Sequence, residues 1–236
     1  MKYWAIVPAA GSGKRMGSDA ALPKQYLRLN DKTLLEHSLL RLDGLDILSG
    51  IVVVLGEDDA QWQDMVLDLA KPVITAPGGA ERAQSVFNGI MALNELATED
   101  DWVIVHDAVR PCVRMSDMQK LVEEVSASDT GGLLAMPVND TLKQVRPDSI
   151  VDTTLNRDQL WRAATPQMFR LGLLRQALDD AINGNIPVTD ESQAMELAGF
   201  NVRLVQCSPD NIKITYPEDL AIASTVLSIQ KGNDRQ

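Results

Sequence analysis

The stretch "YWAIVPAAGSGKRM" at residues 3–16 joins an apolar run to a segment rich in glycine. A strand covered on both faces has nearly continuous apolar sequence, and glycines let the backbone that follows approach a ligand closely. Backbone N–H groups and cations in such a loop bind phosphate. The stretch therefore predicts a buried strand that ends in an anion-binding loop, where Lys14, Arg15 and the later Lys24 would neutralise charge.

Similar apolar runs recur along the chain, and segments with helical spacing of apolar residues separate them. The runs lie at residues 51–55, 72–76, 102–107 and 131–138, and the helical segments at 33–42, 59–70, 82–96, 116–126 and 215–229. Ser116 with Gln119, and Thr215 with Glu218, have the spacing of capping boxes. This alternation predicts an α/β fold, a Rossmann-like, doubly wound and mostly parallel sheet flanked by helices.

Ligands of a doubly wound sheet bind outside the carboxyl ends of its strands, so the sequence at those ends is informative. The first strand ends in the opening loop, and the third in "APGGAERAQS" at residues 76–85. The fourth ends in "HDAVRPC" at 106–112 and the fifth in "PVNDTLK" at 137–143. Because all four ends carry glycine-rich or charged sequence, we expect a binding site along this edge of the sheet.

Residues 139–155, "NDTLKQVRPDSIVDTTL", interrupt the alternation with two β-like runs on either side of "RPD". They predict a hairpin, and a lone hairpin with so little apolar surface is marginally stable. A second copy of the chain is the economical partner for it. We therefore expect a single domain over residues 1–236 with a protruding dimerisation arm at 139–155.

Composition excludes several classes of partner. The 236 residues carry a formal net charge of −11, which would repel nucleic acid and anionic membrane surfaces, so neither is expected as a partner. Cys112 and Cys207 lie far apart and support neither a disulfide framework nor a structural zinc site. No signal peptide and no membrane-spanning run is expected, and a cytoplasmic location follows.

The opening loop taken alone leaves its ligand open. A Walker loop requires Ser or Thr after Gly-Lys, but Gly13-Lys14 is followed by Arg15. The dinucleotide fingerprint requires a third glycine where Met16 stands. A polyphosphate site and a simple turn with solvated cations both remain open at this point.

Eight motifs occur in order along nearly the whole chain. Taken together, they narrow the choice of ligand for the opening loop and of protein family. This pattern resembles the 2-C-methyl-D-erythritol 4-phosphate cytidylyltransferases of the non-mevalonate isoprenoid pathway, in the nucleotide-diphospho-sugar transferase superfamily. The resemblance implies a homodimer joined through the β-arm, and transfer of CMP from CTP to a polyol phosphate with release of pyrophosphate. It also implies a divalent cation, normally magnesium (Mg2+). The motifs are "AAGSGKRM" (9–16), "PKQY" (23–26), "GGAERAQSV" (78–86), "HDAVRP" (106–111), "DTLK" (140–143), "TPQMF" (165–169), "TDES" (189–192) and "NIKIT" (211–215).

The resemblance also implies roles for individual residues, in four groups. The catalytic group is Arg15, Lys24, Arg157 and Lys213. The CTP-binding group is Ala9, Ala10, Gly11, Gly13, Gly78, Gly79, Ser85 and Asp107. The polyol phosphate group is Arg110, Thr141, Thr165 and Thr189, and the metal ligands are Asp107 and Asp210. Because Arg157 and Thr141 lie on or beside the arm, we expect them to serve the partner's active site.

Two alternatives remain beside this interpretation. A ribitol or other pentitol 5-phosphate cytidylyltransferase shares the nucleotide loop and the "HDAVRP" type of motif, although "WRAATPQ" and "TDES" favour the methylerythritol enzymes. A non-catalytic nucleotide-binding regulator on the same fold is the other. The joint presence of Arg15, Lys24, Asp107 and Lys213 argues against the regulator.

Overall fold

The computed structural model describes residues 1–11, 22–57 and 59–233, and its centre is a seven-stranded sheet. The strand order is β11-β7-β10-β6-β1-β4-β5. Only β10 runs antiparallel to its neighbours, so the mostly parallel α/β sheet is confirmed. Its strands are β1 (Tyr3–Pro8), β4 (Leu48–Leu55), β5 (Val73–Pro77), β6 (Trp102–Val105), β7 (Gly131–Pro137), β10 (Trp161–Arg170) and β11 (Arg203–Gln206).

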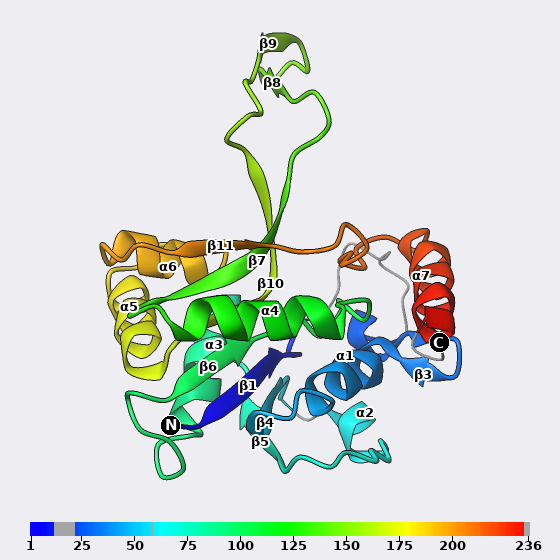
Figure 1. The fold of residues 1–236 in the computed structure, drawn as a ribbon, viewed down its shortest axis with the longest axis vertical. Helices are drawn as coiled ribbons and strands as arrows, with labels where there is room; N and C mark the ends of the chain where they lie inside the picture. Colours follow the sequence, from blue (N-terminus) through cyan, green and yellow to red (C-terminus); the bar gives the residue numbers. More distant parts are fainter. Residues whose placement is uncertain (12–21, 58, 234–236) are drawn as a thin grey trace.

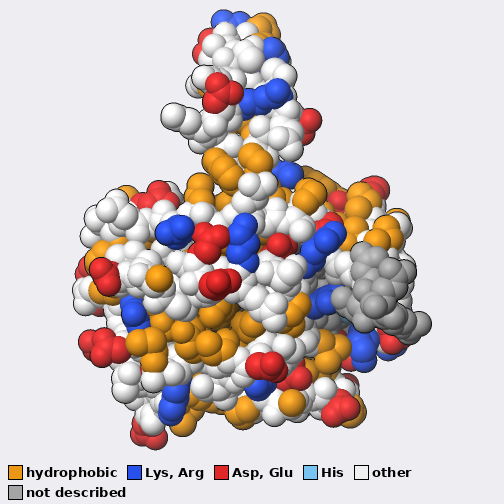
Figure 2. Space-filling view, viewed as in Figure 1, with side chains coloured by type: hydrophobic (Ala, Val, Ile, Leu, Met, Phe, Trp, Pro, Cys, Tyr) orange, Lys and Arg blue, Asp and Glu red, His pale blue; other side chains and the backbone are white. Residues whose placement is uncertain are grey.

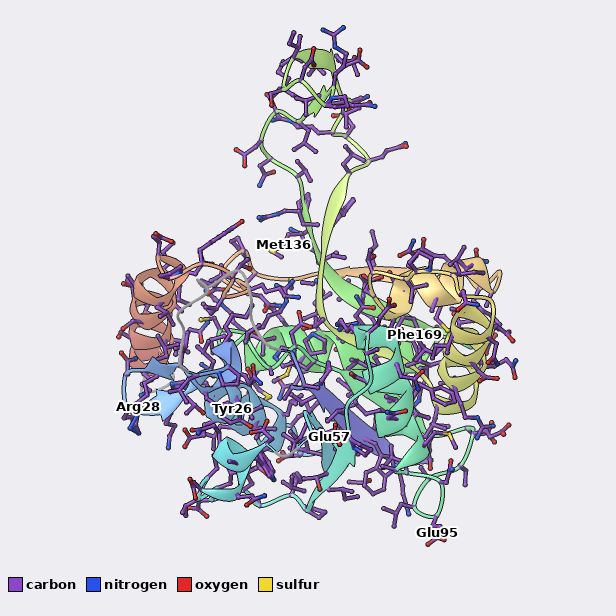
Figure 3. All side chains as sticks on the ribbon, turned by 180° about the vertical axis from the view of Figure 1, so that it is seen from behind. Tyr26, Arg28, Glu57, Glu95, Met136 and Phe169 are labelled. Carbon is purple, nitrogen blue, oxygen red and sulfur yellow. The ribbon has the colours of Figure 1, made fainter. Side chains whose placement is uncertain are left out.

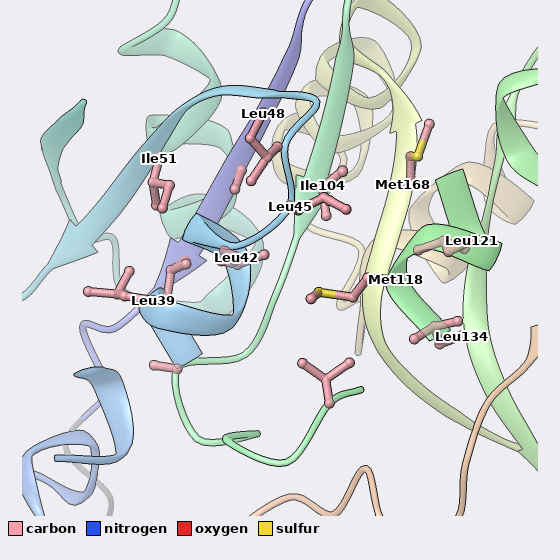
Figure 4. Packing of buried hydrophobic residues seen from close by; sticks show 14 of the residues in the cluster. Leu39, Leu42, Leu45, Leu48, Ile51, Ile104, Met118, Leu121, Leu134 and Met168 are labelled. Atoms are coloured by element: carbon pink, nitrogen blue, oxygen red, sulfur yellow. The ribbon is translucent and has the colours of Figure 1, made fainter. Parts of the chain in front are cut away.

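Helices cover both faces of this sheet, as Figure 1 shows. The side chains of alternate β1 residues pack in two different hydrophobic cores, because successive side chains of a strand point to opposite faces of the sheet. Ala5 and Val7 pack in the core covered by α1 (Leu34–Asp43) and α4 (Met115–Ser126), part of which Figure 4 shows. Trp4 and Ile6 pack in the opposite core, with α3 (Arg82–Met91), α5 (Leu171–Asn183) and α6 (Glu191–Leu197).

A third, smaller core attaches the last helix beside the carboxyl edge of the sheet. Helix α7 (Asp219–Asn233) packs through Ala223 and Leu227 against Val109, Ile214 and neighbouring apolar residues. The remaining short elements near this edge are the 3-10 helix η2 (Lys24–Tyr26) and the two-stranded pair β2 (Arg28–Leu29) and β3 (Lys32–Thr33). This packing places the segments after β6 and β11 next to each other.

The predicted arm is present as a hairpin that projects from the body. Strands β8 (Lys143–Val145) and β9 (Val151–Thr154) pair antiparallel at its tip (Figure 1). Figure 2 shows charged side chains near the tip and hydrophobic ones at the base. Val145, Ile150 and Val151 are each more than half exposed, so the arm buries little apolar surface within one chain.

The prediction of a helix over residues 59–70 is wrong for most of that range. Helix α2 covers only Ala60–Gln63, and residues 65–69 have no regular secondary structure. Met65, Leu67 and Leu69 pack partly buried against the core, while Val66 and Asp68 between them are exposed. A period of two, as in an extended chain, therefore replaces the helical period in this segment.

Other boundaries also differ from the sequence-based expectation. Helix α3 ends at Met91, short of residue 96, and neither predicted capping box forms. The N-cap of α4 is Arg114, which makes no side-chain capping bond. At α7 the carboxylate of Asp219 accepts hydrogen bonds from the backbone N–H groups of Thr215 and Tyr216. The segments that form β10, α5, α6 and β11 were not assigned from the sequence.

In the described residues, no helix combines the length and apolar character needed to cross a bilayer.

The core beneath α1 gives a test of this packing. Leu39 is fully buried, whereas its neighbour Leu40 on the same helix is 37% exposed. We expect Leu39→Ala to lower the free energy of unfolding by about 2–5 kcal/mol, through lost transfer energy and an unfilled cavity. The control Leu40→Ala should stay within about 0.5 kcal/mol of the wild type. Urea unfolding followed by circular dichroism measures both, and equal losses would contradict the assigned burial.

Candidate active site

A cleft of about 540 Å³ opens at the carboxyl ends of β1 and β6. This is where the strand order of the sheet reverses, with β4 and β5 on one side of β1 and β6 on the other, and ligands of such sheets bind at that point. Many residues predicted from the sequence line it. They are Ala9, Ala10, Gly11, Lys24, Gly79, Ser85, Asp107 and Lys213.

A second cavity of about 190 Å³ adjoins the first. Arg110, Thr165 and Thr189, all predicted as polyol phosphate contacts, line it together with residues that were not predicted. Three residues border both cavities, namely Arg82, Asp107 and Lys213. The site thus has a large compartment and a small one with a charged wall in common.

Close backbone packing shapes the floor of the large compartment. A Cβ atom on Gly78 would lie 2.3 Å from the Cβ atom of Ala10, so only glycine fits there without displacing the loop after β1. The neighbouring Gly79 donates its backbone N–H to Oγ of Ser85 at 3.0 Å. Ser85 in turn donates to the carbonyl of Glu81. Gly78 and Ser85 therefore hold the loops that face the cleft.

Lys24 reaches the rim because the turn that carries it is tied to β1. The side-chain amide of Gln25 is buried and donates to the carbonyl oxygen of Ala9 at 2.6 Å. Tyr26, which is labelled in Figure 3, is buried in the core under α1. Two consecutive buried side chains thus fix η2, and Lys24 at its start borders the cleft.

Asp107 is the centre of charge on the common wall. Its carboxylate contacts Lys213 Nζ at 2.9 Å, and Arg82 and Arg110 at 3.2 Å each. Burial by itself disfavours the charged form, but Arg82, Lys213 and Arg110 outweigh it and hold the pKa of Asp107 far below its usual range. The carboxylate is therefore ionised at every pH at which the protein would function.

Arg82 is shared between two carboxylates. One amino group of its guanidinium contacts Asp107, and the other donates to Glu191 at the start of α6. Glu191 is fully buried, and this burial raises the pKa of its carboxyl despite the opposing effect of Arg82. The same two carboxylates raise the pKa of Arg82 against the effect of its own burial.

A chain of hydrogen bonds behind Asp107 fixes its backbone. Nε2 of the buried His106 lies 3.1 Å from the carbonyl of Arg110, which can only accept, so Nε2 carries the proton. Nδ1 then accepts from the hydroxyl of Thr165, which itself accepts from the backbone N–H of Asp107. Burial lowers the pKa of His106 to about 4, in agreement with a neutral ring.

An irregularity in β10 brings Thr165 into the site. The pairing of β10 with β7 shifts register between Ala163 and Gln167, and such an irregularity re-aims the side chains within it. The side-chain amide of Asn211 donates to the Thr165 carbonyl, and its backbone carbonyl accepts from Arg110. Asn211 therefore connects the "TPQMF" and "NIKIT" motifs to each other and to the charged wall.

The structure does not bring every predicted residue to the cleft. Thr141 is exposed on the arm, and Arg157 is exposed just beyond its end, where it donates to the carbonyl of Asn139. Asp210 accepts from Arg114 at 2.7 Å and from Gln230, and it lines neither cavity. Gly78 supports the cleft without being part of its lining. Gly13 and Arg15 lie outside the described residues.

One ionised carboxylate on this wall fits a hard divalent cation. In the described residues, no group of three or more His, Cys, Asp or Glu side chains could hold a metal ion. Magnesium in phosphate-transferring enzymes is bound by one or two carboxylates, with substrate phosphates and water supplying the other ligands. Asp107 borders both cavities and supplies one such carboxylate, whereas Asp210 lines neither cavity.

Sequence reasoning missed several residues that build the site. Arg82 lies in the "GGAERAQS" stretch and Gln25 in "PKQY", so both were within recognised motifs. Glu191 belongs to "TDES", but its pairing with Arg82 joins positions 109 residues apart. His106 belongs to "HDAVRP", but no role was predicted for it from the sequence. A charged residue next to glycines at a strand end was the available signal for Arg82.

The fold and the site together define a class of protein. A doubly wound sheet with a nucleotide-sized cleft at its switch point, bordered by glycine loops, lysines and an arginine, is that of an enzyme acting on a nucleotide phosphate.

Comparison with known proteins specifies the family. Residues 3–229 match the family model of 2-C-methyl-D-erythritol 4-phosphate cytidylyltransferase. Proteins of that name from Pseudomonas entomophila and Ectopseudomonas mendocina are 48% and 49% identical, over 92% and 93% of both chains. The crystal structure of the Francisella tularensis protein of this name superposes with a TM-score of 0.83 at 36% identity, covering 96% of this chain and 100% of that one. The chain belongs to this family of nucleotidyltransferases.

The buried, neutral His106 makes stability depend on pH. Its pKa of about 4 in the folded chain lies below the ordinary value of 6.5, so the unfolded chain binds more protons between these two values. His106 should therefore cause a loss of about 2 kcal/mol in the free energy of unfolding between pH 7 and pH 5. In the His106→Gln variant, we expect this part of the pH dependence of the free energy of unfolding to vanish. Urea unfolding at pH 7 and pH 5 measures it. Identical pH profiles for variant and wild type would contradict the assignment.

Proposed function

We propose that this chain transfers CMP from CTP to 2-C-methyl-D-erythritol 4-phosphate, giving 4-diphosphocytidyl-2-C-methyl-D-erythritol and pyrophosphate. The observation that carries the proposal is the wall of Arg82, Asp107 and Lys213 common to two adjoining cavities. A reaction that joins two phosphates needs both at one point, with cations on either side. The names of the relatives give the acceptor, 2-C-methyl-D-erythritol 4-phosphate, and the cytidylyl group that is transferred.

In the proposed reaction, an oxygen of the polyol phosphate attacks the α-phosphorus of CTP. A new phosphorus–oxygen bond forms there, the bond from the α-phosphorus to the bridging oxygen of the β-phosphate breaks, and pyrophosphate leaves with that electron pair. A phosphate monoester has a second pKa near 6 and is largely dianionic at neutral pH. The nucleophile therefore requires no general base, and the neutral, buried His106 is not needed as one.

The barrier to this step is the approach of two anions and the charge that develops at the α-phosphorus. Lys24 borders the large compartment and Lys213 borders both, so we assign them to the phosphates of CTP and to the transferred group respectively. Arg15, two residues after Gly13 in the sequence, is proposed as a further cation for the triphosphate. Ala9, Ala10, Gly11 and Gly79 would contact the nucleotide through their backbones.

We propose Mg2+ as the divalent cation, and Asp107 is the residue that would hold it. When bound, it neutralises phosphate charge. The small compartment would take the polyol phosphate, with Arg110, Thr165 and Thr189 as contacts.

The chain is further proposed to act as one domain and as a homodimer in the cytoplasm, with CTP and a polyol phosphate as its small-molecule partners. Two buried, unpaired cysteines are consistent with a reducing compartment. The exposed apolar side chains of the arm support a partner subunit as its cover. Thr141 and Arg157 would then reach the partner's small compartment.

Pyrophosphate release tests the reaction and the choice of polyol together. We expect release from CTP, in preference to ATP, GTP and UTP, only when 2-C-methyl-D-erythritol 4-phosphate is added, and little with ribitol 5-phosphate. Lys213→Ala should lower kcat by about 10²–10³-fold, because a cation at the transferred group is lost. The control Lys120→Ala alters an exposed lysine of α4 that lines neither cavity, and its kcat should be unchanged. A preference for ribitol 5-phosphate would reassign the substrate.

Mixed dimers test whether the arm serves the other subunit. An Arg157→Ala chain and a Lys24→Ala chain, each of low activity alone, are combined with two affinity tags and purified as the heterodimer. We expect about half of the wild-type activity, because one of the two sites in this heterodimer is intact. A purified heterodimer no more active than its parents would show that both residues act in the same subunit's site.

A further inference from the structure

We infer that Glu191 is a positioning residue for the transfer reaction: its ion pair holds the Arg82 guanidinium on the wall between the two cavities, where Arg82 contacts the transferred phosphate. This inference rests on the proposed function and adds two residues to it. Neither residue was assigned a role by its sequence motif.

The place of Arg82 determines what it can contact. The α-phosphate of CTP must lie where the large and small compartments meet, because the attacking phosphate comes from the small one. Arg82, Asp107 and Lys213 are the residues that border both compartments. The Arg82 side chain is 26% exposed, so part of it faces the cleft although both carboxylates contact it. A planar guanidinium at this point can donate to two phosphate oxygens at once.

Glu191 controls where that guanidinium points. Its side chain is 1% exposed, and Oε1 accepts from Nη1 of Arg82. The other oxygen, Oε2, is buried without a hydrogen-bond partner among the described residues. A buried carboxylate is costly unless a cation compensates it, so the pair strongly disfavours rotation of Arg82 towards solvent. Without Glu191, Arg82 would be free to turn both amino groups towards Asp107.

The segment that carries Glu191 is itself fixed. Asp190 caps α6 by accepting from the backbone N–H of Gln193. The buried amide of Gln167 donates to Asp190 and accepts from the backbone N–H of Ser192. Hydrogen bonds thus hold the residues on both sides of Glu191 to β10, and its carboxylate has a defined position relative to the cleft. Such support is what the orientation of a catalytic group requires.

A double-mutant cycle on pyrophosphate release tests the inference. Glu191→Gln keeps the size of the side chain and removes its charge. We expect it to lower kcat about tenfold by misplacing Arg82, with KM for CTP changed by less than about twofold. Arg82→Ala should lower kcat about 100-fold. In the Arg82→Ala background, Glu191→Gln should change kcat by less than about twofold, because the arginine through which it acts is missing.

Thermal unfolding of the same variants gives a readout that does not depend on activity. Arg82→Ala leaves a buried carboxylate unpaired and should lower the Tm, and adding Glu191→Gln should raise the Tm again. Glu196→Gln, an exposed residue of the same helix, is the control and should change neither kcat nor Tm. If Glu191→Gln fails to fold, Glu191→Asp replaces it. Asp keeps the negative charge but is one methylene shorter, so its carboxylate lies farther from Arg82, and we expect the same loss of kcat.

Two results would overturn the inference. One is a folded Glu191→Gln protein with the kcat of the wild type. The other is an equal loss of kcat from Glu191→Gln in the presence and absence of Arg82. If the wild type itself releases no pyrophosphate from CTP with a polyol phosphate, the proposed function fails instead. The recovery of Tm in the double variant still reports on the Arg82–Glu191 pair in that case.

Discussion

The site depends on one buried carboxylate, that of Asp107 at the end of β6. It is 5% exposed, and an ion in such a place is tolerated only when opposite charges compensate it. The chain supplies these from three separate segments, as Arg82 from α3, Arg110 from the loop after β6, and Lys213 from the segment after β11. Asp107 thereby gathers distant cations into one wall, and the two cavities share that wall.

The framework of this arrangement could be predicted because it follows from local sequence. Apolar runs located β1, β4, β5, β6 and β7, and the rule for doubly wound sheets placed the loop ends at one edge. The secondary-structure predictions that failed concern segments whose conformation is determined by tertiary packing. Residues 65–69 face the core at alternate positions because of what they pack against, and β10 is antiparallel because the arm returns the chain to the sheet.

The residues of the site could likewise be predicted where local sequence motifs identify them, and could not where they depend on contacts between distant segments. Motifs at strand ends identified Ala9, Lys24, Asp107 and Lys213, all of which line the large compartment, although their roles stay predictions. The pairing of Arg82 with Glu191, and the chain of hydrogen bonds from His106 through Thr165, join positions 109 and 59 residues apart. No local pattern encodes such contacts, since each residue alone has the appearance of an ordinary helical or loop residue.

The charges of the wall explain how an acidic protein can bind two anions. The whole chain carries −11, yet three cations at the wall between the cavities, Arg82, Arg110 and Lys213, form ion pairs with just two carboxylates, Asp107 and Glu191, among the described residues. With both carboxylates ionised, these five side chains have one positive charge in excess. The carboxylates therefore order the cations without cancelling them. At short range in a partly buried cleft, such local charges outweigh the distant surface charges, which solvent and salt screen.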